Sequence, residues 1–119
     1  MKKNVKKLWL QALRSGKYLQ AKGRLRTHNK FCCLGVLCDL HGKKFKQNNW
    51  TWREQEYAYL ADGFILSSQV KKWAGLNDSD PEIIRNNKLT TLASLNDGNK
   101  MGLKPKTFKQ IANIIEKYL

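Results

Sequence analysis

The amino-acid sequence predicts a single compact α+β domain over residues 1–119, mostly helical and with a small antiparallel sheet. Two segments, one at each end of the chain, carry apolar residues at helical spacing. A segment in the middle has instead the aromatic, turn-bounded pattern of strands. The 119 residues, 41% of them hydrophobic, are the usual size of one domain and can fill one core.

The first segment is predicted to form an amphipathic helix that ends at Ser15-Gly16. Its apolar stripe recurs at the i, i+3, i+4, i+7 and i+8 positions and consists of Val5, Leu8, Trp9, Ala12 and Leu13. Residues 17–30 are polar and interrupted by glycine, with no clear periodicity. We expect a loop there, with at most a short strand.

Residues 31–40 are apolar on nearly all sides, which is typical of a buried helix or a buried strand. A helix is favoured because Asn29 could cap its start and Gly42 its end. Gly35 in the interior costs roughly 1 kcal/mol relative to alanine, which suggests that another element packs closely against it. We expect this segment at the centre of the core.

Strands and turns are predicted between residues 41 and 66. Three short aromatic or apolar runs at 50–52, 57–60 and 64–66 are joined by turn residues, Asp62-Gly63 among them. Ser67 or Ser68 is then expected to cap a short helix that ends at Gly75. This helix would bury Val70, Trp73 and Ala74.

The last third of the chain is predicted to be helical. Asp80-Pro81 has the pattern of a cap followed by proline at the first helical position, and Leu89, Leu92 and Leu95 keep helical spacing up to a turn at 96–98. Thr107 and Gln110 form a capping box that opens the final helix. Its apolar face comprises Phe108, Ile111, Ala112, Ile115 and Tyr118.

The charge of the chain is concentrated in its first fifty residues. Thirteen lysines and arginines stand there against one acid, Asp39, which gives +12 of the total +14; ten bases and eight acids follow. Like charges held together on a compact body repel, so such a field is best understood if it meets a polyanion. A solvated lysine-rich surface and a partner protein are the alternatives.

Candidate phosphate contacts come from this basic half, because arginine offers a forked donor and lysine a point charge. The principal set is Lys17, Lys22, Arg24, Arg26, His28 and Lys30. Trp50 and Trp52 could stack on bases, with a place in the core as the alternative. A secondary basic surface comprises Lys2, Lys3, Lys6, Lys7 and Arg14.

Enzymatic chemistry has little support in the sequence. Cys32, Cys33 and Cys38 diverge on a helix and make a poor zinc site, so we expect free thiols, no metal and no cofactor. A thiol nucleophile paired with His28 or His41 stays a third hypothesis. No phosphate-binding glycine loop, zinc-protease or dinucleotide motif is present.

Several segments together resemble a group of small accessory proteins encoded by bacteriophages. They are Lys7-Leu8-Trp9, residues 12–16, the Phe-Cys-Cys-Leu-Gly-Val-Leu-Cys run at 31–38, residues 70–76, and the Leu-Asn-Asp-Gly turn at 95–98 before the last helix. The resemblance spans almost the whole chain. It implies a viral protein, and no assigned activity comes with it.

The basic half and the resemblance together predict a non-enzymatic counter-defence protein. It would bind nucleic acid or a phosphorylated signalling nucleotide; an inhibitor or adaptor that binds a host enzyme or defence protein is the alternative. The chain has no run of about eighteen apolar residues and starts without a secretory signal. We therefore expect no membrane partner and a location in the host cytoplasm.

Overall fold

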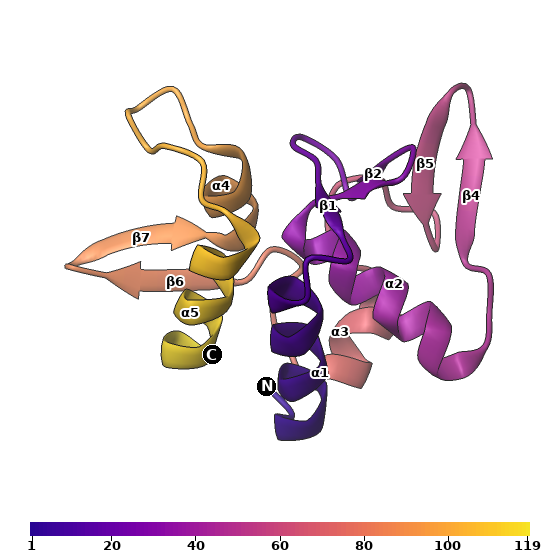
Figure 1. Cartoon of the computed structure of the whole chain (residues 1–119), viewed down its shortest axis with the longest axis horizontal. Helices are drawn as coiled ribbons and strands as arrows, with labels where there is room; N and C mark the ends of the chain where they lie inside the picture. The colour runs from indigo at the N-terminus through magenta and orange to yellow at the C-terminus, as the bar shows by residue number, and fades with distance from the viewer.

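The computed structural model describes all residues 1–119 as an α+β domain of five helices and seven short strands. The helices lie in the middle of the molecule, and two β-hairpins project from opposite ends of its long axis (Figure 1). In chain order the elements are α1 (Lys3–Arg14), β1 (Leu19–Gln20), β2 (Arg26–Thr27), β3 (Lys30–Phe31), α2 (Cys33–Phe45), β4 (Trp50–Arg53), β5 (Glu56–Tyr59), α3 (Ser68–Ala74), β6 (Glu82–Arg85), β7 (Lys88–Thr91), α4 (Leu92–Asp97) and α5 (Phe108–Tyr118).

The predicted α+β class is therefore confirmed, and α2 lies at the centre of the core as expected. It packs against α1, α3 and α4, and residues 31–38 are all buried. The indole Nε1 of Trp9 on α1 donates to the carbonyl oxygen of Cys33 at 2.9 Å. This bond joins the first helix to the start of the central one.

The predicted ends of α2 are wrong. Cys32, rather than Asn29, is the N-cap residue, and its Sγ accepts from the backbone N–H of Gly35. The helix continues past Gly42 to Phe45, and Lys46 ends it in the left-handed conformation. Gly42 has a packing role instead, because a Cβ there would lie 3.2 Å from the Tyr59 hydroxyl.

The strands form three small sheets. β1, β3 and β2 make a three-stranded sheet in which β1 runs parallel and β2 antiparallel to β3, where the sequence predicted only a loop with a short strand. β4 and β5 make the predicted antiparallel hairpin. Residues 64–66 are not a strand, because the Asp62 carboxylate accepts the N–H groups of Phe64 and Ile65 and turns the chain.

The helix predicted from Asp80-Pro81 is also wrong. The antiparallel hairpin β6–β7 stands there, turned by Asn86 and Asn87, both at positive φ. Asparagine tolerates this conformation, and two such residues suit the tight hairpin turn. Thr91 is the N-cap residue of α4, and Asp80 adds a second acceptor at the start of that helix, because its Oδ1 accepts from the N–H of Ala93 at 2.9 Å.

Local signals predicted the other helices well. Ser67 caps α3 and Gly75 ends it, and Thr107 and Gln110 form the capping box of α5. Within the apolar stripes, Leu8 and Tyr118 are exposed rather than buried, and Leu10 is buried instead of Leu8. None of the five helices has the length and apolar character needed to cross a membrane.

Candidate polyanion-binding groove

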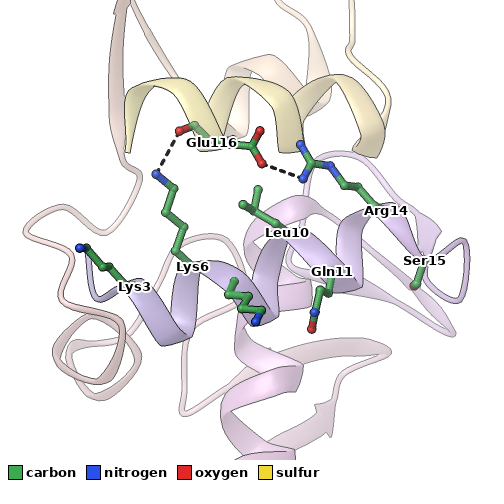
Figure 2. Close-up of a pocket in the computed structure, with 8 residues that line it drawn as sticks. Lys3, Lys6, Leu10, Gln11, Arg14, Ser15 and Glu116 are labelled. Carbon is green, nitrogen blue, oxygen red and sulfur yellow. Dashed lines mark hydrogen bonds and ion pairs between the residues drawn. The ribbon is translucent and has the colours of Figure 1, made fainter.

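A basic groove runs along α1 where this helix meets α5 (Figure 2). Its volume is about 550 Å³. The residues that line it are Lys3, Lys6, Lys7, Leu10, Gln11, Arg14, Ser15 and Glu116. Four cations thus surround the groove and one carboxylate offsets them, so the site attracts anions.

The helical repeat brings the cations of α1 together. Lys3, Lys7 and Arg14 are separated by four and seven residues, which places them within about 40° of one another around the helix and over a rise of about 16 Å. The first turn of α1 contains no acid to offset the positive end of the helix dipole. Cations there weaken the helix slightly, so an anion in the groove would relieve an unfavourable charge.

Two of the four cations also dock α5 onto α1. Arg14 donates through Nη1 to Glu116 Oε2 at 2.9 Å and through Nη2 to Asn113 Oδ1 at 2.8 Å. Lys6 Nζ donates to the carbonyl oxygen of Glu116 at 3.1 Å, and both contacts to Glu116 are visible in Figure 2. The hydrogen bond from Arg14 lowers the pKa of the Glu116 carboxyl.

Lys3 and Lys7 are free for a ligand. Both are exposed, and the three ion pairs of the chain involve other cations, Arg14, Arg24 and Lys43. Lys2, the remaining member of the secondary basic surface, points elsewhere, because its Nζ donates to the carbonyl oxygen of Lys72 on α3.

The principal predicted set separates into free lysines and engaged arginines. Lys17, Lys22, His28 and Lys30 are exposed. Arg24 is half-buried: it lies 3.4 Å from Glu56, donates to the carbonyl oxygen of Tyr57, and covers the ring of Phe64 at 4.4 Å. Its guanidinium is held by the β4–β5 hairpin and the segment after it.

Arg26 is enclosed by aromatic rings. Its guanidinium lies 4.0 Å from the ring centre of Tyr57, 5.2 Å from that of Phe31 and 5.4 Å from that of Trp50. Its Nε donates to the carbonyl oxygen of His28 at 2.6 Å. The side chain fastens the three-stranded sheet to the β4–β5 hairpin and leaves little of its charge for a ligand.

The two tryptophans predicted to stack on bases differ in their surroundings. Trp50 packs against Phe31 and Tyr59, and its Nε1 donates to Asp39 at 3.1 Å. Trp52 is 51% exposed, beside Tyr57 and His28. Only Trp52 therefore offers a ring face at the surface.

The sequence did not predict the partners of Arg14 on α5, which are Glu116 in the groove lining and Asn113 next to it. Both lie about one hundred residues away from Arg14 in the sequence. An acid on the polar side of a terminal helix carries no local signal of its partner, so only the packing of α5 against α1 reveals them.

The cysteines lie away from any open surface. Cys32, Cys33 and Cys38 are free and buried, and burial raises the pKa of each thiol, that of Cys32 to about 11. His41 Nδ1 lies 2.6 Å from the Tyr59 hydroxyl. No group of three or more His, Cys, Asp or Glu side chains is arranged to hold a metal ion.

Fold and groove together define a small α+β domain with a cationic helix on its surface. The chain belongs to the family described as Domain of unknown function (DUF8296), whose sequence profile matches residues 1–119. No curated protein and no solved structure shows significant similarity to the chain.

Proposed function

We propose that this protein binds the phosphate backbone of nucleic acid along α1, with Lys3 and Lys7 as the main contacts. The groove that carries Lys3, Lys6, Lys7 and Arg14 is the observation that supports the proposal. Within it, Lys3 and Lys7 stand free of ion pairs while Arg14 stays fixed on α5. An arginine held in place next to exposed lysines without ion pairs suits an anion with several charges.

The shape of the groove favours a strand over a mononucleotide. The cations extend over a rise of about 16 Å, whereas phosphates on one strand of duplex DNA recur about every 3.4 Å along the axis. Leu10 is the only hydrophobic residue in the lining, so no ring is available there to stack on a base. Binding through phosphates alone is independent of sequence.

The resemblance to bacteriophage accessory proteins extends this proposal to a biological role. A viral protein with such a groove would cover nucleic acid that host defence uses. A phosphorylated signalling nucleotide is the competing ligand, and the same experiment distinguishes the two.

The test measures fluorescence anisotropy of a labelled 20-nucleotide mixed sequence, single- and double-stranded, between 50 and 200 mM KCl. Four contacts give a slope of log K against log salt of about −3.6 for duplex, or roughly a hundredfold loss over that range. The double variant Lys3→Glu/Lys7→Glu should remove most of the affinity at 50 mM salt and make the slope shallower by about 2.

The matched control is Lys22→Glu/Lys30→Glu, which makes the same change of charge in two exposed lysines of the 17–30 segment. It should change affinity by less than threefold. Lys3→Glu also supplies the acid that the first turn of α1 lacks, so thermal stability should hold or rise. Equal losses in both variants, absence of binding at low salt, or complete competition by a mononucleotide would each overturn the proposal.

A further inference from the structure

A second groove lies along strand β7 and shares no lining residue with the groove on α1. Its volume is about 660 Å³. It is lined by Arg85, Asn86, Lys88, Leu89, Thr90, Leu95, Asn99, Met101, Gly102, Leu103 and Lys106. The lining residues come from the β6–β7 hairpin on one side and from α4 and the loop between α4 and α5 on the other. Figure 1 shows this loop above the hairpin.

The groove follows the outer edge of β7. Successive side chains of a strand point to opposite faces, yet the consecutive residues Lys88, Leu89 and Thr90 all line the groove. Strand β7 therefore faces the groove with its edge and not with one of its two faces. None of the backbone hydrogen bonds that the chain makes outside its helices and sheets involves residues 82–91, so this edge is unpaired.

Two aliphatic side chains of the groove along β7 are highly exposed to solvent. Leu89 is 62% exposed and Met101 is 93% exposed, while Leu95, which also lines the groove, is buried. An unpaired strand edge next to exposed apolar side chains is a template for another strand. A partner that adds a strand there would pair the free backbone groups and cover these side chains.

The charge of the groove lining indicates which kind of partner it would bind. The lining contains the cations Arg85, Lys88 and Lys106 and no acid. A second copy of this chain carries the same net charge of +14 and would be repelled. Nucleic acid would suit the cations, but the lining offers no aromatic ring for its bases and would leave the aliphatic side chains without a partner.

We propose that the groove along β7 binds an extended acidic segment of a partner protein, added as a third strand to the β6–β7 hairpin. Carboxylates on the segment meet Arg85, Lys88 and Lys106. Apolar residues between them pack on Leu89 and Met101. The site is separate from the groove on α1 and does not depend on nucleic-acid binding.

The experiment selects peptides from a random 12-residue display library on the full chain, with removal of those that also bind the Leu89→Asp variant. Enriched peptides should carry a net charge of −3 or below and alternate acidic with apolar residues. The strongest, made synthetically, is titrated by fluorescence anisotropy. Methylation of alternate backbone nitrogens on that peptide should weaken binding tenfold or more, because it removes the donors of a third strand.

The hairpin supplies a matched control. Ile84 is directly opposite Leu89 and is 67% exposed, but it does not line the groove. Leu89→Asp should lower affinity for the synthetic peptide at least tenfold, whereas Ile84→Asp should change it by less than twofold. Lys3→Glu/Lys7→Glu should leave peptide affinity unchanged, which separates this site from the groove on α1.

Three results would overturn the proposal. One is no enrichment, or enrichment of neutral or basic peptides. Another is equal loss in Leu89→Asp and Ile84→Asp. The third is displacement of the peptide by a 12-residue oligothymidine whose own binding is lost in Leu89→Asp, because that would assign the groove to nucleic acid.

Discussion

Gly35 on α2 lies directly against the backbone of Leu25: a Cβ atom on Gly35 would be 1.8 Å from the Leu25 carbonyl oxygen. The same oxygen accepts from the N–H of Cys32 at 3.1 Å, and Leu25 is fully buried. The close approach therefore fixes the segment between β1 and β2 on the central helix. It also accounts for a glycine in the first turn of α2.

The first prediction is that Gly35→Ala lowers the free energy of unfolding by at least about 2 kcal/mol. Overpacking against a backbone atom outweighs the gain in helix propensity of about 1 kcal/mol. Urea unfolding followed by circular dichroism measures it. Gly16→Ala is the control, because a Cβ there meets nothing within 4 Å and only the positive φ is strained. A neutral or stabilising Gly35→Ala would contradict the contact.

The second prediction concerns Asn96, a fully buried polar side chain. Its Oδ1 accepts from the N–H of Cys33 at 3.1 Å and from Gln20, and its Nδ2 donates to the carbonyl oxygen of Ala21 at 2.8 Å. Asn96→Leu would leave buried groups on two other segments unpaired. We expect a loss of about 2–4 kcal/mol in the free energy of unfolding, measured by urea titration.

Gln20→Ala controls for the peripheral part of this network. Gln20 is only half-buried, so its removal should cost about 1 kcal/mol. Equal losses of unfolding free energy in the two variants would show that the buried hydrogen bonds of Asn96 stabilise the fold no more than those of Gln20.

Sequence patterns predicted the parts of the fold that depend on neighbours in the chain. Ser67 and Thr107 cap the helices that follow them because a cap needs only the next three residues. Asp80-Pro81 predicted a helix at the wrong place for a related reason. Asp80 does accept a helix N–H, but from Ala93, and the intervening hairpin is decided by the turn at Asn86 and Asn87.

The candidate site, like the fold, could be predicted only in the features that depend on nearby residues. The basic character of α1 follows from the sequence, because the cations lie off the apolar stripe. Which cations stay free depends on distant partners: Glu116 engages Arg14, and Glu56 engages Arg24. These pairings arise only when the hairpin β4–β5 and helix α5 dock, so periodicity alone could not separate an unpaired lysine from an arginine held by an ion pair.

The third prediction follows from the difference between arginines that other side chains hold and lysines that are exposed. Arg26→Glu should lower the free energy of unfolding by about 2 kcal/mol, because it removes a cation enclosed by Tyr57, Phe31 and Trp50 and brings a carboxylate to their faces. Lys22→Glu, on an exposed lysine nearby in sequence, should change it by less than about 0.5 kcal/mol. Thermal unfolding of the two single variants measures both. Equal stability would mean that Arg26 is not held by the rings.

The fourth prediction is that stability falls at alkaline pH. Burial raises the pKa of Cys32 from 9.0 to about 11, and it raises the pKa values of Cys33 and Cys38 well above 9.0. Below about pH 9 the thiols are protonated in both states; above it the unfolded chain loses protons first. The free energy of unfolding should then fall by about 1.4 kcal/mol per pH unit for each thiol, through pH 11 for Cys32. Urea titrations at a series of pH values test this.

The same burial makes the thiols unreactive in the folded protein, which gives an independent check of the alkaline effect. At pH 8 alkylation by iodoacetamide should be at least about 100-fold slower than that of Gln11→Cys, a thiol placed on the exposed side of α1. In urea all three native thiols should react at the rate of the added one. Rapid alkylation of a native cysteine in the folded state would contradict the buried placement and would revive the hypothesis of a thiol nucleophile.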